Sequence, residues 1–389
     1  MSALTFINAD MGGLRADTLR VVGSRIAAIG VRPEGADRVV DLQGDRLLPG
    51  LINAHDHLQL NSLPSMAASG HHENVRTWID DVNALRRADP NFESAIAVSR
   101  EERLLIGGVK NLLSGVTTVA QHDPLYPCLF NATYPTRVVT DYGWSHSLYL
   151  DDAEQVRNSH RDTPADEPWI IHAAEGIDHE AHSEFERLEA LGCIGANTLL
   201  VHGVALDAAQ RLRLDRAAAG LIWCPASNLR LFGQTAQVCD LIARGRVALG
   251  TDSRLSGSRD LLEELRIAGE CGGLDEPTLE SLVTHVSARL LRLPDRGELK
   301  IGALADLLIL PAGMRVSTAT RADIHLVMLD GRVRYGDAVY AQLASPQPDW
   351  VEVTVDGRPK ILNCAIAALL LSASVSEPGV ELSKLWRAA

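Results

Sequence analysis

Short apolar runs alternate with longer amphipathic stretches along the middle of the chain. The short runs predict buried strands, and the longer stretches, in which apolar residues recur at helical spacing, predict helices. Such alternation is typical of βα units around a parallel sheet. The predicted strands cover residues 51–54, 117–120, 137–140, 169–171, 198–201, 221–224 and 247–249, and the predicted helices cover 75–88, 92–113, 153–160, 180–191, 208–219 and 260–269.

The two ends of the chain share a different pattern. Short β-rich pieces separated by turn residues occur before residue 49 and again after residue 300. We therefore predict an α/β fold in which a (β/α)8-type, TIM-like barrel over residues 49–300 carries a small β-sandwich domain. Residues 1–48 and 301–343 would build the sandwich. Residues 344–389 form a C-terminal extension, in which a predicted helix at 362–374 docks on the same chain.

Composition narrows the class of protein. The formal net charge of −13 and the lack of a Lys/Arg cluster argue against a nucleic-acid partner. No apolar run is long enough to span a bilayer, and the first residues do not resemble a signal peptide. The six cysteines are scattered without a paired spacing, which argues against a disulfide framework. We expect a cytoplasmic homodimer that acts on a small molecule.

A His-x-His pair, His55 and His57, directly follows the predicted strand at 51–54. Alternate residues of a strand point to the same side, so both imidazoles can reach one metal ion. A lone pair of this kind is more often structural than a ligand set. Three further predicted strands, however, end in metal-type or acid–base residues. The strand at 169–171 is followed by His172 and Glu175, the strand at 198–201 by His202, and the strand at 247–249 by Asp252.

The carboxyl ends of all strands in a parallel barrel open on one face, so these six residues are expected to converge. Three imidazoles and a carboxylate complete a metal site that can still hold a water. A metal lowers the pKa of such a water to about 7. A second carboxylate, outside the ligand set, can take and return the proton.

Six motifs, in this order, resemble the amidohydrolase superfamily over about residues 3–340. The resemblance is closest to its mononuclear aminohydrolases, namely the cytosine, guanine and S-adenosylhomocysteine deaminases and the chlorotriazine hydrolases. The motifs are Pro-Gly-Leu-Ile-Asn-Ala-His-Asp-His (49–57), Gly-Val-Thr-Thr (115–118), His-Ala-Ala-Glu (172–175), Cys-Pro-Ala-Ser-Asn-Leu (224–229), Leu-Gly-Thr-Asp-Ser (249–253) and Gly-Ala-Leu-Ala-Asp-Leu (302–307).

The resemblance implies a role for each candidate. His55, His57, His172 and Asp252 would bind one divalent metal ion, Zn or Fe, because residues 137–150 lack the lysine that bridges two metals in binuclear relatives. Glu175 would shuttle a proton to the leaving nitrogen. His202 would polarise the scissile centre, and Asp252 would also accept a proton from the attacking water.

The chain departs from the family between residues 121 and 169, where the usual Pro-His-Ala-Pro-Tyr-like segment is missing. Either the barrel is distorted or incomplete there, or residues 142–148 supply the missing strand. Substrate contacts are accordingly expected from the loops after strand ends. The candidates are His122, Trp144, His146 and Arg254, although a structural hydrogen bond or salt bridge is an alternative for each, and Asn228 is expected only to shape a turn.

The predicted function is hydrolysis of a carbon–nitrogen bond other than a peptide bond. The favoured hypothesis within this class is deamination of an N-heteroaromatic or amidine-type small molecule. Hydrolysis of a cyclic or acyclic amide is the alternative within enzymes. A catalytically silent assembly protein on the same fold is the alternative from another class, and the intact ligand set argues against it.

Overall fold

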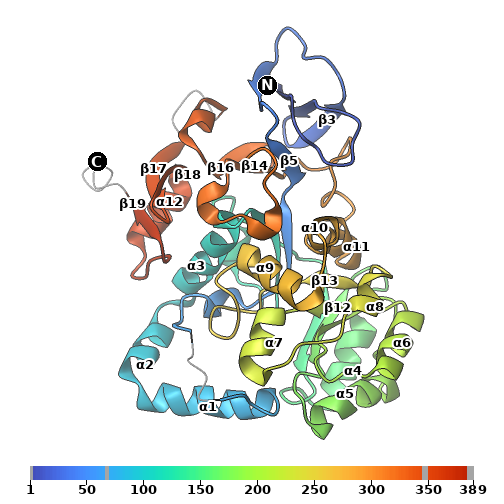
Figure 1. The fold of residues 1–389 in the computed structure, drawn as a ribbon. Helices are drawn as coiled ribbons and strands as arrows, with labels where there is room; N and C mark the ends of the chain where they lie inside the picture. The colour runs from blue at the N-terminus through green and yellow to red at the C-terminus, as the bar shows by residue number, and fades with distance from the viewer. Residues whose placement is uncertain (1–2, 66–69, 344–348, 383–389) are drawn as a thin grey trace.

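Eight parallel strands form the centre of the computed structural model, which describes residues 3–65, 70–343 and 349–382 (Figure 1). They lie in two sheets, with the strand orders β6-β7-β8 and β13-β12-β11-β10-β9. The predicted α/β fold with parallel strands is confirmed. The strands are β6 (Leu51–Asp56), β7 (Val116–Gln121), β8 (Arg137–Val138), β9 (Gly143–Ser147), β10 (Trp169–Ala173), β11 (Thr198–His202), β12 (Gly220–Trp223) and β13 (Val247–Leu249).

The two sheets meet on one side only. An isolated parallel bridge joins Asp56 to Asp252, and the amide of Thr251 donates a 2.9 Å hydrogen bond to the carbonyl of His55. Gly250 permits this close approach, because a Cβ there would come within 2.7 Å of the His55 Cβ. Within the described residues β8 and β9 form no ladder, so the structure shows no closed barrel.

Strand β9 settles the question left open between residues 121 and 169. It pairs in parallel with β10, with Gly143 opposite Trp169 and Trp144 opposite Ile170. The segment around residues 142–148 therefore supplies the missing strand. The expected distortion also exists, since the ladder is interrupted between β8 and β9.

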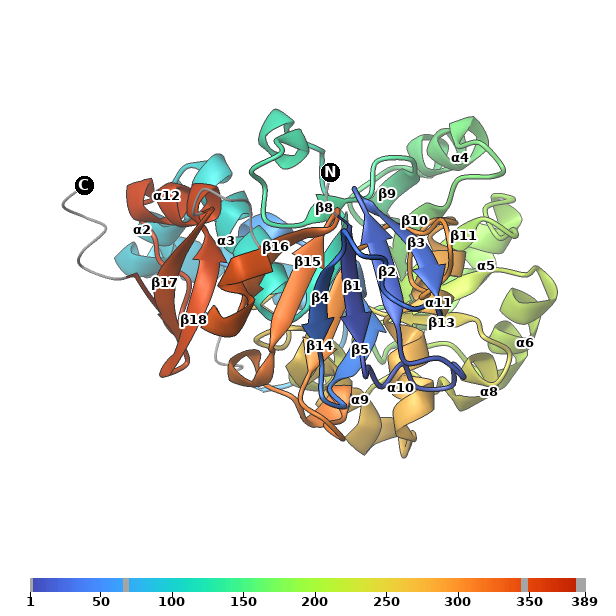
Figure 2. The same ribbon diagram turned by 90° about the horizontal axis from the view of Figure 1, so that it is seen from above.

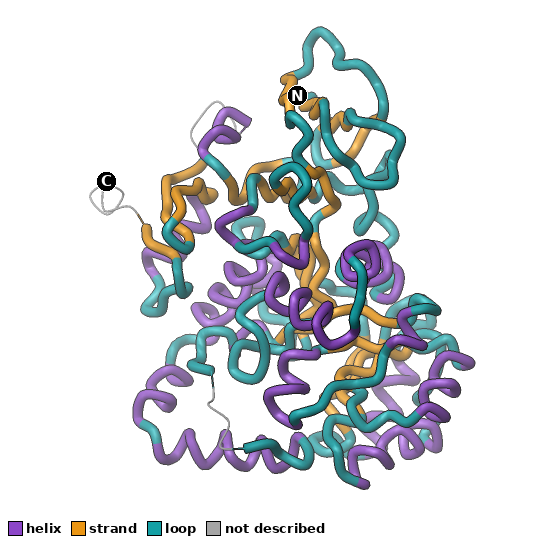
Figure 3. Tube along the Cα trace, in the orientation of Figure 1, coloured by secondary structure: helices purple, strands orange, loops and turns teal. Residues whose placement is uncertain are grey.

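Helices surround the two sheets (Figure 3). The predicted helix at 75–88 is confirmed. The single helix predicted over 92–113 is wrong, because Ser99 caps a new helix by accepting a hydrogen bond from the Glu102 amide. The helices are α1 (Val75–Ala88), α2 (Pro90–Ala97), α3 (Arg100–Leu113), α4 (Ala153–Asp162), α5 (His179–Ala190), α6 (Ala208–Arg216), α7 (Pro225–Phe232), α8 (Cys239–Ile242), α9 (Leu261–Gly272), α10 (Glu276–Leu282), α11 (His285–Leu290) and α12 (Cys364–Ser372).

Strands from both chain ends form two further sheets (Figure 2). One has the order β3-β2-β1-β4, and the other has the order β19-β17-β18-β16-β15-β14-β5. An apolar cluster, including Phe6, Leu47 and Ile309, packs residues of both sheets together. The strands are β1 (Leu4–Ile7), β2 (Leu19–Val22), β3 (Arg25–Ile29), β4 (Arg38–Asp41), β5 (Arg46–Pro49), β14 (Leu307–Leu310), β15 (Leu326–Leu329), β16 (Arg332–Gly336), β17 (Trp350–Val355), β18 (Arg358–Asn363) and β19 (Val380–Leu382).

The C-terminal extension is more than a docked helix. Strand β18 pairs with β16, through Tyr335 opposite Leu362, so the extension continues the sheet of the preceding segment. The predicted boundary at residues 343 and 344 borders residues 344–348, which lie outside the described part of the chain. In the described part, no helix is both long and apolar enough to cross a membrane.

Candidate active site

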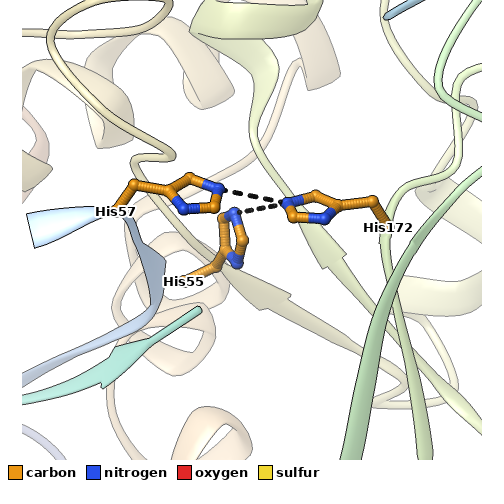
Figure 4. A group of neighbouring side chains, drawn as sticks. All are labelled: His55, His57 and His172. Carbon is orange, nitrogen blue, oxygen red and sulfur yellow. Dashed lines mark hydrogen bonds between the residues drawn. The ribbon is translucent and has the colours of Figure 1, made fainter. Parts of the chain in front are cut away.

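Three histidine rings meet where β6 and β10 end (Figure 4). The Nε2 atom of His172 lies 3.2 Å from that of His57 and 3.3 Å from that of His55. The Oδ1 atom of Asp252 lies 3.7 Å from the Nε2 of His55 and 3.6 Å from that of His57. The structure thus brings together the four residues expected to bind a metal.

These separations suit a metal ion. Zinc–nitrogen bonds of about 2.0–2.1 Å in a tetrahedral site place neighbouring ligand atoms roughly 3.3 Å apart. The donor set, three imidazoles and one carboxylate, is that of a catalytic zinc or iron site with room for a water.

A hydrogen bond from the second ring nitrogen fixes the orientation of two of the expected ligand imidazoles. The Nδ1–H of His57 donates to the carboxylate of Asp123 at 2.7 Å, and that of His172 donates to the carbonyl of His146 at 2.7 Å. These contacts leave the Nε2 lone pairs free to bind a metal. Burial holds the pKa of His172 well below its usual range and lowers that of His55 to about 4, which keeps both rings neutral.

A hydrogen bond to Oδ2, the carboxylate oxygen that faces away from the histidines, fixes the side chain of Asp252. The Ser256 hydroxyl donates to Oδ2 of Asp252 at 2.6 Å, which leaves Oδ1 facing the histidines. Asp252 and His202 have φ values of 58° and 73°, in the left-handed region that costs a non-glycine residue on the order of 1–2 kcal/mol. This local strain coincides with the strand ends that present the two side chains to the site.

Glu175 and His202 form a second pair beside the donor set. Oε1 of Glu175 lies 3.4 Å from Nε2 of His202, and both side chains are buried. Burial, reinforced by the nearby charges of Asp252 and Glu184, raises the pKa of Glu175 well above its ordinary value. The Nδ1 of His202 contacts Oδ1 of Asn228 at 2.9 Å, so Asn228 orients a site histidine, whereas we predicted only a turn-forming role.

A buried lysine that sequence analysis missed anchors the His-x-His segment. Lys110 of α3 and Asp56 are both completely buried, with Nζ 3.1 Å from Oδ2. Lys110 also donates to Asn61 at 2.8 Å and to Thr251 at 2.9 Å. Asn111 donates to the same carboxylate at 2.8 Å. This network ties the residue between the two histidine ligands to the segment that carries Asp252.

The donor atoms open into a pocket of about 420 Å³. The part of its lining beside the donor set, called the floor here, includes His57, His172 and Asp252 together with Glu175 and His202, whereas His55 is not among the lining residues. Leu60, Trp78 and Phe92 line it as well; these come from η1 (Leu58–Leu60), α1 and α2, which no motif had indicated.

The four expected substrate contacts are placed differently from one another. His146 lines the pocket. His122 instead stacks on His172, with ring centroids 4.1 Å apart, and its Nε2–H donates to the carbonyl of Ser145 at 2.9 Å. Trp144 packs against an apolar cluster among the strands. His122 thus contacts a ligand ring, Trp144 is half-buried against the cluster, and neither side chain lines the pocket.

Arg254, for which a structural salt bridge was the alternative expectation, is paired with groups of its own chain. Its guanidinium makes two hydrogen bonds to the carboxylate of Glu377, at 2.8 and 2.5 Å, and its Nε donates to the carbonyl of Arg259. Glu377 belongs to the C-terminal extension and also accepts from Arg321 at 2.6 Å. Arg254 is therefore used in a buried ion-pair network and does not line the pocket.

A protein-family model and several curated relatives match this chain. A model of the amidohydrolase family matches residues 160–334. The 5-methylthioadenosine/S-adenosylhomocysteine deaminase of Halobacterium salinarum is 26% identical, covering 80% of this chain and 86% of the relative. The 5'-deoxyadenosine deaminase of Methanothermobacter thermautotrophicus is 25% identical, covering 84% and 91%.

Solved structures share the fold. An adenosine deaminase from Xanthomonas campestris with bound zinc superposes with a TM-score of 0.69 at 19% identity, covering 85% of this chain and 92% of the other. An atrazine chlorohydrolase from Arthrobacter aurescens complexed with zinc gives a TM-score of 0.67 at 18% identity, covering 86% and 95%. At these low sequence identities the structural similarity shows the fold alone.

Proposed function

We propose, from the confirmed resemblance of this chain to the amidohydrolase superfamily, that it is a metal-dependent aminohydrolase of an N-heteroaromatic or amidine-type small molecule. The comparisons confirm the broader class, a hydrolase of carbon–nitrogen bonds other than peptide bonds. The observation that carries the proposal is the position of Glu175. Its carboxyl lies in the same pocket as the donor set but contacts His202, so it stays available for proton transfer.

We propose that His55, His57, His172 and Asp252 hold one divalent metal, zinc or iron. When bound, the metal lowers the pKa of a coordinated water, so that hydroxide is available near neutral pH. The protein's own groups would position the ligands and transfer protons. Asp123, the His146 carbonyl and Ser256 hold the ligands in position through the contacts described above.

Proton transfer falls to the groups beside the donor set. Addition of water to the amino-bearing carbon forms a carbon–oxygen bond, and cleavage of the carbon–nitrogen bond then releases ammonia. Glu175 takes a proton and returns it to the leaving nitrogen, which its buried, readily protonated carboxyl suits. We assign polarisation of the reacting centre to Nε2 of His202, and its distance of 3.4 Å from that carboxyl supports this role.

The test is a screen for ammonia release by zinc-loaded protein from amino-substituted purines, pyrimidines, pterins and triazines. Ammonia from at least one ring, lost in Glu175→Gln, supports the proposal. Hydrolysis of dihydropyrimidine-type or open-chain amides without ammonia release would favour the amide alternative instead. Retention of metal without any turnover would favour a silent protein. Elemental analysis showing two metals per chain would overturn the mononuclear site.

We further infer that the eight parallel strands form an open TIM-like barrel and that the two chain-end sheets are its small β-sandwich domain. The support is their order around the site and the apolar cluster shared by the end sheets. The homodimer and the cytoplasmic location stay predictions. Light scattering of the purified protein and fractionation of its host cells test them.

A further inference from the structure

One side of the pocket is built from apolar side chains and is called the apolar wall here. Its residues pack into a small cluster of their own, separate from the main core clusters. Leu63 and Phe92 are buried, whereas Trp78 of α1 is half-buried. Figure 1 shows α1 and α2 together at the end of the molecule away from the N-terminal sheet. The apolar wall consists of Leu60, Leu63, Trp78, Val82, Phe92 and Ile96.

Charged groups are distributed unequally between the floor and the wall. The carboxylates among the described lining residues are Asp123, Glu175 and Asp252. Each of them contacts a group of the metal floor, as described above. The described lining therefore offers no free carboxylate to a polyhydroxylated substituent such as a sugar. Of its two amide side chains, Gln59 already pairs with Asp123 and Gln121, which leaves Asn83.

The arginines of α3 do not change this picture. Arg103 lines the pocket, but its guanidinium donates to the backbone carbonyls of Gln59 and Val98, both at 3.2 Å. Arg100 is exposed at the same helix end. Two cations disfavour a cationic substituent, and neither supplies an acceptor for hydroxyl groups.

We propose that the pocket selects substrates whose amino-bearing ring carries an apolar alkyl or aryl substituent, with Trp78 as a specificity-determining residue. The inference rests on the proposed function, since the reacting carbon must lie beside the donor set. A substituent of the ring is then left to the apolar wall. A pocket of about 420 Å³ is within the range of about 300–1,000 Å³ that holds drug-sized ligands, so it can accept more than the ring.

The expected size of the effect follows from apolar burial. One buried methylene contributes about 0.8 kcal/mol, which corresponds to about fourfold in affinity or in kcat/KM. Lengthening an alkyl chain should raise kcat/KM by up to about fourfold per methylene until the wall is covered. A hydroxylated substituent of similar size should lose this gain.

The experiment uses 9-methyladenine, 9-propyladenine, 9-hexyladenine and adenosine with the zinc-loaded protein. Ammonia release gives kcat/KM, and calorimetry on the Glu175→Gln variant gives affinity without turnover. We expect both to rise with chain length and to be lower for adenosine than for 9-propyladenine. Trp78→Ala should flatten the dependence at least several-fold, and Trp78→Phe should keep most of it.

Leu85→Ala is the matched control. Leu85 lies on the same helix and packs against the same cluster, but it does not line the pocket. If Leu85→Ala flattens the dependence as strongly as Trp78→Ala, or if affinity ignores chain length, the inference is overturned while ammonia release stands. Failure of every compound to bind also overturns it. If affinity rises with alkyl chain length but no compound releases ammonia, the result supports the apolar wall as the binding surface for the substituent and overturns the proposed reaction.

Discussion

Replacement of Glu377 by glutamine tests whether the C-terminal extension supports the metal-binding loop. Glu377 is 2% exposed and accepts hydrogen bonds from Arg254 and Arg321, whose guanidinium groups are also buried. Asp260 is the other carboxylate of this network, 2.7 Å from Nε of Arg321. Two cations and two anions balance here, and Glu377→Gln leaves one positive charge uncompensated.

The cost can be worked from these contacts. Removing one partner of a buried ion pair typically destabilises by about 3–5 kcal/mol, and the isosteric amide should fall near 3 kcal/mol. An unfolding entropy of about 2.1 cal/mol/K per residue amounts to roughly 0.8 kcal/mol/K for 389 residues. The melting temperature should therefore fall by about 4 °C. Because Arg254 follows Asp252 by two residues, zinc affinity should fall as well.

The assay is differential scanning calorimetry with and without zinc, together with competition for zinc by a chelator. Glu352→Gln is the control, because Glu352 lies exposed on β17 of the same extension. Both variants lose one negative charge, so a general charge effect would move them equally. Equal melting temperatures for the two variants would refute the argument that Glu377 stabilises the buried network.

Three further predictions concern the site and its surroundings. Glu175→Gln should keep zinc, measured by elemental analysis, but lower kcat at least about 10²-fold. Asp123→Asn should weaken zinc binding about 10–100-fold, because His57 loses the partner that orients it, and chelator competition measures this change. Burial raises the pKa of Glu184 to about 7, so its folded form holds a proton that the unfolded chain releases near 4.5. Stability should therefore decline by up to about 3 kcal/mol as pH rises from 4.5 to 7, and Glu184→Gln should remove that decline in melting curves.

The metal-site geometry could be predicted because it depends on strand ends. His55, His57, His172 and Asp252 each follow an apolar run, and parallel strands bring such ends to one face. The partners of predicted residues depend instead on distant segments. Arg254 meets Glu377, 123 positions away, and no local pattern contains that pairing.

Other features carried a signal that we did not use. Residues 351–355 alternate apolar and polar side chains, and Asp356-Gly357 supplies a hairpin turn, with φ values of 48° and 78°. These signals predict β17 and β18, whereas we predicted a helix alone. Lys110 stands among the buried residues of α3, most of which are apolar. The amphipathic pattern of α1 indicates an apolar face, but it cannot tell whether that face covers a core or lines a pocket.

The incomplete closure of the strand ring changes what the metal does for the fold. His55 and His57 lie at the end of one sheet, and His172 and Asp252 lie at the strand ends of the other. Among the described residues, one isolated bridge and a few backbone hydrogen bonds join the two sheets. A bound ion would therefore add a further link on the side where the two sheets already meet, while the side between β8 and β9 keeps no ladder in the described residues. Ligand binding to the folded state adds about 2.7 kcal/mol of stability at a free concentration of 100 times Kd. In metal-depleted protein, amide hydrogen exchange should accelerate first along β6, β8 and β9, because β6 loses a link to the other sheet and β8 and β9 border the side without a ladder.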